Sequence, residues 1–260
     1  MSREYVHLER EGAVALVVMD NPATLNAMDE DLGPQLARAL EGLALDQTTR
    51  AVVLSGAGGV FSGGGNMARA HEHLKDHEGA SELFAAYTKW VQRVVAALTG
   101  LPQPVVCAVE KASSGAGLGW MLASDFVICD EAAKLVAGFL AIGLGPGAGV
   151  SLNLARRLGL ARTSELLYLN RRLEPREALA WGLVDELRPA AEVLPRALEL
   201  AAQLARGPAR ALAASKALLN AAARRGLLTQ CSDERRVVMQ VADLPEFRRR
   251  VTRFMGGGRD

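Results

Sequence analysis

Two short glycine-rich segments are the strongest candidates for chemistry in this 260-residue chain. They are Gly63-Gly64-Gly65 and Gly115-Ala116-Gly117, and they come several residues after the apolar runs 51–54 and 105–109. A strand that ends in such a turn and opens a helix can direct free backbone N–H groups at a negative charge. If both turns face one point, their amides form an oxyanion hole for a carbonyl oxygen that gains charge. The alternative is that both are tight turns that pack against neighbouring strands.

Other glycine motifs do not fit the sequence. Gly56-Ala57-Gly58 fails the dinucleotide fingerprint, because Phe61 occupies the third glycine position. No lysine followed by serine or threonine comes after the glycines, so a phosphate loop is missing. Neither segment reads Gly-x-Ser-x-Gly, which argues against a nucleophilic serine.

The composition excludes several classes of protein. Thirty basic and twenty-nine acidic residues leave a formal charge of +1, which favours neither nucleic acid nor a membrane surface as partner. No apolar run approaches the roughly 20 residues that span a bilayer, and the charged start has no signal-peptide core. Cys107, Cys129 and Cys231 are widely spaced among apolar residues. We therefore expect a cytoplasmic protein with reduced core cysteines and no metal site.

The elements that must position the two turns follow a repeated order of strand, glycine-rich turn and helix. Strands are predicted at 51–54, 105–109 and 126–129, after a hairpin formed by 6–9 and 13–19. Asp29 is placed to cap a helix whose apolar positions recur at three and four residues. A second amphipathic helix is expected over 81–98. Beyond Gly149 the pattern is helical, with predicted helices at 150–158, 162–169, 175–181, 190–204, 209–223, 228–241 and 244–255. This order indicates an α/β protein.

Six segments carry a resemblance to a known family, and they occur in order along nearly the whole chain. The chain resembles the crotonase superfamily, the enoyl-CoA hydratase/isomerase family. The resemblance implies an α/β crotonase (ClpP-like) spiral of ββα units with a C-terminal helical extension. It also implies a core over 1–200 with an acyl-CoA site, an oligomerisation segment over 201–260, and a homotrimer or homohexamer. The segments are 21–27, 58–66, 101–109, 115–125, 143–149 and 178–184.

The resemblance also assigns individual residues. It places the two oxyanion donors on the backbone N–H groups of Gly65 and Ala116. Coenzyme A would arrive as part of the substrate, so no separate cofactor is expected. Phe254 of the last helix would lie near the adenine of a neighbouring subunit, with Arg249, Arg253 or Arg259 meeting the phosphates. The remaining coenzyme A contacts fall on Ala23, Thr24, Leu25, Gly63 and Asn66, the last in place of a usual aspartate.

The chain departs from the family where the hydratases carry their two glutamates. Gly119 and Phe139 occupy those positions, and neither residue can transfer a proton. Gly147 stands where a subset of isomerases has an aspartate. We therefore expect an enzyme that stabilises a thioester enolate, with an isomerase-type reaction ahead of a decarboxylase, and a hydratase last. A catalytically silent protein that binds coenzyme A remains the alternative.

The missing glutamates leave the proton donor to be found in the segment after the first glycine turn. That segment holds five candidates with competing interpretations. His73 and His77 are four residues apart among charged residues, as on a solvated helix face. Tyr87 shares the apolar spacing of Phe84 and Val91, which favours packing. The candidates are Tyr87, Lys89, His71, His73 and His77.

Overall fold

The computed structural model describes residues 3–224 and 227–256. Its centre is a six-stranded sheet in the order β1-β2-β3-β4-β6-β8, in which β1 runs antiparallel to β2 and the other neighbours are parallel. The predicted hairpin and the three predicted strands are confirmed, whereas β8 was not foreseen. The strands are β1 (Val6–Glu11), β2 (Val14–Met19), β3 (Ala51–Gly56), β4 (Val105–Val109), β6 (Phe126–Asp130) and β8 (Glu186–Arg188).

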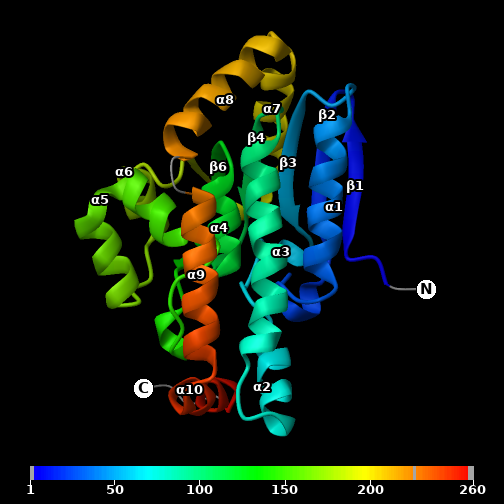
Figure 1. Cartoon of the computed structure of the whole chain (residues 1–260). Helices are drawn as coiled ribbons and strands as arrows, with labels where there is room; N and C mark the ends of the chain where they lie inside the picture. Colours follow the sequence, from blue (N-terminus) through cyan, green and yellow to red (C-terminus); the bar gives the residue numbers. More distant parts are fainter. Residues whose placement is uncertain (1–2, 225–226, 257–260) are drawn as a thin grey trace.

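Helices cover both faces of the sheet, whose inner strands are apolar along most of their length. In β3, Val52 and Leu54 join the cluster formed with α1 (Leu32–Leu45) and α3 (Ser81–Gly100). Val53 joins a separate cluster with α7 (Ala190–Ala205). Figure 1 shows α1 and α3 side by side along the strands. Such continuous apolar runs are typical of parallel strands between two helical layers.

Besides the central sheet, the chain forms a second sheet of two short strands. The strands β5 (Ala112–Ser114) and β7 (Lys134–Val136) pair in parallel. Isolated bridges join Met28 to Gly65 and Ser62 to Ser113. Strands β2, β3, β4 and β6 are each followed by a short paired segment and then by a helix, so the predicted spiral of ββα units is confirmed. Residues 112–114 were predicted as loop, since three small residues carry no strand signal of their own.

After Gly149 the described elements are helices, as predicted, apart from the strand β8. Besides α7, they are α5 (Val150–Tyr168, interrupted at Gly159), α6 (Pro175–Ala180), α8 (Ala209–Arg224), α9 (Leu227–Ala242) and α10 (Pro245–Met255). Residue 200, the expected boundary between core and extension, lies inside α7. Among the described residues, no helix is long and apolar enough to cross a bilayer.

The last two helices fold back onto their own chain. Helix α9 packs along α3, and α10 lies against α2 (Met67–Asp76), at the same end of the molecule in Figure 1. Phe247 and Val251 of α10 are fully buried in a cluster with Leu74, Phe84 and Ile142. The C-terminal helix therefore forms part of the wall around this region.

The expectations for the cysteines and for Asp29 are confirmed, and Asp125 has a comparable structural role. The three cysteines are free and buried, and burial raises the pKa of Cys129 to about 12. Asp29 accepts the N–H of Leu32 at 2.9 Å in the first turn of α1. Asp125 accepts the N–H of Val105 at 2.8 Å and an ammonium hydrogen of Lys216 at 2.6 Å. These side chains serve the fold.

Candidate active site

The two glycine-rich turns lie directly against each other. The N–H of Ser114 donates to the carbonyl of Ser62 at 3.1 Å, and the N–H of Ser62 donates to the carbonyl of Ala112 at 3.0 Å. At Gly64, a β-carbon would lie 2.8 Å from the carbonyl oxygen of Ser114, which is closer than side chains tolerate. The chain needs glycine there for the two turns to meet, so the convergence expected from the sequence is present.

Two N–H groups at this junction are left without an acceptor. The neighbouring N–H groups of Gly63, Gly64 and Asn66 donate to Leu25, Ser62 and Met28, and that of Gly115 donates to Ala137. Within the described part of the chain, no hydrogen bond uses the N–H of Gly65 or of Ala116. Ala116 is the first residue of α4 (Ala116–Ala123), where the helix provides no partner. The two predicted oxyanion donors are therefore adjacent and available.

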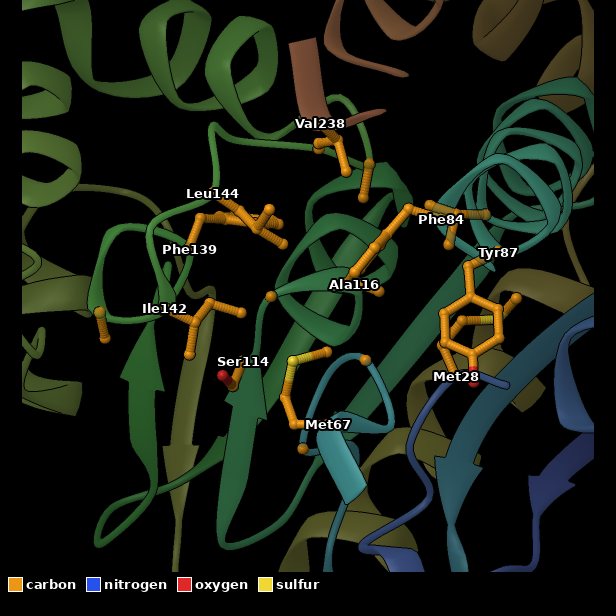
Figure 2. Close-up of a pocket in the computed structure, with 18 of the residues that line it drawn as sticks. Met28, Met67, Phe84, Tyr87, Ser114, Ala116, Phe139, Ile142, Leu144 and Val238 are labelled. Carbon is orange, nitrogen blue, oxygen red and sulfur yellow. The ribbon is translucent and has the colours of Figure 1, made fainter. Parts of the chain in front are cut away.

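Gly65 and Ala116 both line a cavity of about 350 Å³. Figure 2 shows Tyr87 and Met28 on one side of it and Phe139, Ile142 and Leu144 on the other. Its polar side chains are few, while the apolar ones come from several turns of the spiral. The apolar wall residues are Met28, Met67, Phe84, Val91, Val136, Phe139, Ile142, Leu144, Ala148, Val238 and Phe254. An uncharged, shaped cavity beside two free amides is suited to an apolar acyl group.

Gly119, where the resemblance implies the first hydratase glutamate, is closed off by a neighbouring residue. Gly119 is buried in α4 and does not line the cavity. A β-carbon on Gly119 would lie 2.3 Å from the Cβ of Ala148, which itself has the left-handed φ of 58°. Ala148 therefore fills the space through which a side chain at position 119 would have to pass.

The second hydratase position and the isomerase aspartate position face the same apolar region. Phe139 lines the cavity, and a β-carbon on Gly147 would lie 3.6 Å from its ring. Val238 of α9 also contacts this place. Neither position supplies a group that could accept a proton, in agreement with the expectation from the sequence.

Of the five candidate proton donors, the structure brings one to the cavity. Tyr87 lines it, whereas His71, His73, His77 and Lys89 do not. The ring centres of His73 and His77 lie 3.9 Å apart at the C-terminal end of α2, and the ammonium of Lys89 lies 5.5 Å from the centre of the Trp90 ring. The histidine and lysine candidates are therefore wrong as cavity groups, because their helix faces point elsewhere.

The coenzyme A positions divide into two groups. Ala23, Thr24 and Leu25 form the exposed turn η1 (Pro22–Thr24) and its end, and the carbonyl of Leu25 accepts the N–H of Gly63 at the cavity. Asn66 is buried and does not line the cavity. Its side-chain amide N–H donates to the carboxylate of Asp29 at 3.1 Å, and its side-chain oxygen Oδ1 accepts the backbone N–H of Arg69 at 3.2 Å. The side chain of Asn66 thus caps α2.

Phe254 lines the cavity of its own chain. This position follows from the packing of α10 through Phe247 and Val251 onto α2 and α3 of the same chain. Its expected place beside a neighbouring subunit's adenine stays a prediction. Arg249 and Arg253 border an adjoining surface groove together with Phe254. Arg259 lies outside the described residues.

Glu234 is a residue that the sequence analysis missed. Its buried carboxylate, on α9, accepts the N–H of Gly149 at 2.7 Å and the hydroxyl of Ser151. Both partners belong to the start of α5, directly after Ala148. A carboxylate at a helix N-terminus stabilises it, so Glu234 holds the turn that covers Gly119. The 85-residue separation from Gly149 left no local signal for this contact.

Known proteins resemble this chain over nearly its whole length. Residues 9–257 match the family model described as enoyl-CoA hydratase/isomerase. The 1,2-epoxyphenylacetyl-CoA isomerase of Escherichia coli (strain K12) is 30% identical over 253 residues, covering 97% of this chain and 95% of that protein.

Solved structures agree with the sequence relatives. The crystal structure of an enoyl-CoA hydratase from Mycobacterium avium subsp. paratuberculosis K-10 superimposes with a TM-score of 0.84 at 30% identity, covering 97% of this chain and 96% of that one. A monofunctional enoyl-CoA isomerase from M. smegmatis gives 0.72 at 28% identity, covering 87% and 98%. By fold, by sequence and by the paired glycine turns, this chain belongs to the enoyl-CoA hydratase/isomerase family of the crotonase superfamily.

Proposed function

We propose that this chain is an acyl-CoA enzyme that stabilises a thioester enolate and shifts a proton or a double bond without adding water. The observation that carries the proposal is the pair of unengaged N–H groups of Gly65 and Ala116 beside one apolar cavity. Two preorganised donors lower the energy of the enolate oxygen, which makes the α-proton of a thioester easier to remove.

The absence of water-adding chemistry is supported by the positions of Gly119 and Phe139. One is sealed beneath Ala148 and the other is a phenyl ring in the cavity wall. Hydration needs one group to activate water and one to deliver a proton. An isomerase-type reaction needs only a proton that leaves one carbon and returns to another.

A decarboxylase is the second candidate. It is supported by the scarcity of ionisable groups around the cavity, where Tyr87 stands among uncharged residues. A carboxylate that enters such surroundings loses its hydration, which favours its departure as carbon dioxide. Loss of carbon dioxide itself generates the enolate, so this reaction requires no base.

The proposed substrate is an acyl-CoA thioester whose acyl group occupies the cavity. The exposed turn Ala23–Leu25 lies next to Gly63, so a coenzyme A moiety there would present its thioester to Gly65 and Ala116.

We also propose a homotrimer or homohexamer, supported by Leu218 and Leu219 of α8, each 72% exposed. Light scattering of the full chain tests the assembly, and a monomer at micromolar concentration contradicts it.

The enolate proposal is tested by removing one N–H group. Ala116→Pro deletes the donor at the first position of α4, where proline suits a helix. In heavy water with phenylacetyl-CoA, we expect wild type to incorporate deuterium at the α-carbon, measured by mass spectrometry. Loss of one oxyanion donor should slow this by roughly 100- to 1,000-fold.

Ala116→Gly keeps the N–H and is the matched control, and it should retain most of the wild-type rate. Equal rates for the proline and glycine variants would show that this amide does not hold the enolate. Wild type that incorporates no deuterium from phenylacetyl-CoA, butyryl-CoA or a β,γ-unsaturated acyl-CoA would contradict the proposed function.

A further inference from the structure

Tyr87 is the one side chain in the described wall of the cavity that can gain or lose a proton. Its ring lies beside Met28 on the α3 side of the cavity in Figure 2. The remaining polar side chains of the wall are Thr88, Ser114 and Asn170. Since both glutamate positions are apolar, proton chemistry in this cavity has a single available group.

The hydroxyl of Tyr87 is hydrogen-bonded to a carboxylate that is partly exposed to solvent. It donates to Glu30 Oε2 at 3.2 Å, and Glu30 Oε1 pairs with Arg69 Nη2 at 2.7 Å. Tyr87 is 3% exposed, whereas the side chain of Glu30 is 46% exposed. The three residues belong to α3, the segment before α1, and α2. Together they form a path from the buried cavity to solvent.

Packing explains the ring of Tyr87 but not its hydroxyl. The ring meets Phe84 edge to face at 6.0 Å, a contact that phenylalanine would make equally well. The oxygen is instead placed against a carboxylate that an arginine holds in position. Asp29, the other carboxylate nearby, is occupied by the N–H of Leu32 and by the amide of Asn66. Glu30 is therefore the partner of the phenol.

The charge around Tyr87 limits what it can do alone. Burial, followed by the negative charge of Glu30 beside it, raises the pKa of the phenol well above its usual range. A free tyrosinate is thus disfavoured in the cavity. The phenol can still take part in proton transfer if its own proton leaves as another arrives.

We propose that Tyr87 and Glu30 act as the acid–base pair of this site, in place of the two missing glutamates. The phenolic oxygen takes the α-proton of the thioester while the phenolic proton moves to the Glu30 carboxylate. The electron pair of the broken C–H bond moves into the enolate, whose oxygen is held by the N–H groups of Gly65 and Ala116. The reverse transfer returns a proton to the α-carbon or to the γ-carbon of a conjugated enolate.

This inference rests on the proposed enolate function and adds a route for the proton. Tyr87 is the catalytic residue, because it lines the cavity that would hold the substrate. Glu30 is a positioning residue that acts through Tyr87, and Arg69 fixes its carboxylate. Because Glu30 is exposed, the proton it receives exchanges with water, so label from heavy water reaches the substrate carbon.

The test compares Tyr87→Phe and Glu30→Gln with wild type as full-length chains. Deuterium incorporation into phenylacetyl-CoA, butyryl-CoA and a β,γ-unsaturated acyl-CoA measures proton transfer, and calorimetry with the same thioesters measures binding. Each variant should lose on the order of 100-fold or more in exchange rate, the usual contribution of a general base. Thioester affinity should stay within about threefold of wild type, because packing and the oxyanion donors are unchanged.

Matched controls make the same chemical changes away from the cavity. Tyr168→Phe removes a phenol that is 73% exposed, and Glu82→Gln removes an exposed carboxylate of α3. Both should exchange at the wild-type rate. If wild type exchanges and Tyr87→Phe or Glu30→Gln matches it, the inference is wrong and the enolate function stands. If wild type does not exchange, the proposed function fails, and the inference fails with it.

Discussion

At the scale of single residues, one glycine and one alanine determine which parts of the site are open to neighbouring groups. Gly64 allows the two turns to touch, whereas Ala148 occupies the space above Gly119. The first feature follows from sequence, since clustered glycines indicate close backbone approach. The second does not, because nothing local marks Ala148 as a residue with a positive φ.

The closed position at 119 gives a prediction about stability. Gly119→Glu brings a β-carbon to 2.3 Å from the Cβ of Ala148, so we expect it to lower the free energy of unfolding. Overpacking of this kind costs about 1–3 kcal/mol. Adding Ala148→Gly should recover only part of the loss, because it removes the obstructing methyl group and suits the left-handed backbone but leaves the carbonyl oxygen of residue 148 at 2.6 Å from the new β-carbon.

Denaturant unfolding of the single and double variants measures this effect. Gly42→Glu is the matched control, because Gly42 is an exposed glycine of α1 with nothing within 4 Å of its β-carbon position. It should be as stable as wild type or slightly more so. A Gly119→Glu variant with unchanged stability would show that the space above this position is open.

At the scale of elements, the sequence predicts the last helix but not its destination. The apolar stripe of α10 requires burial, and any neighbour with a complementary face could provide it. Here Phe247 and Val251 meet residues of the same chain, which brings Phe254 to the cavity. Periodicity carries no information about the partner, so the further contact with a neighbouring subunit that the family resemblance implies stays a prediction.

The position of Phe254 predicts an effect on binding. Phe254→Ala removes an aromatic part of the cavity wall, so we expect the Kd for phenylacetyl-CoA to rise about tenfold, as for loss of a partly buried aromatic contact. Met255→Ala, at a neighbouring exposed position outside the wall, is the control and should bind as wild type. Calorimetry measures the Kd of phenylacetyl-CoA for both variants. Equal affinities of the two variants would mean that Phe254 does not contact the ligand.

At the scale of the whole molecule, strong local patterns were predictable and pairings made at a distance were not. The sheet strands β3, β4 and β6 are continuous apolar runs, and the later helices show clear periodicity. The short strands β5 and β7 depend on pairing with each other and with isolated residues of other segments. The same division holds at the site, where the glycine turns were visible in the sequence. The contacts of Tyr87 with Glu30 and of Glu234 with Gly149 join segments far apart in the chain.

The central claim is that this cavity forms an enolate but does not add water. Its most direct test is one incubation of crotonyl-CoA and phenylacetyl-CoA with the full chain in heavy water enriched in oxygen-18, followed by mass spectrometry. We predict deuterium on carbon in at least one thioester and no oxygen-18 in β-hydroxybutyryl-CoA, because neither Gly119 nor Phe139 can activate water. Oxygen-18 incorporated as fast as deuterium, or no deuterium in either thioester, would contradict this account.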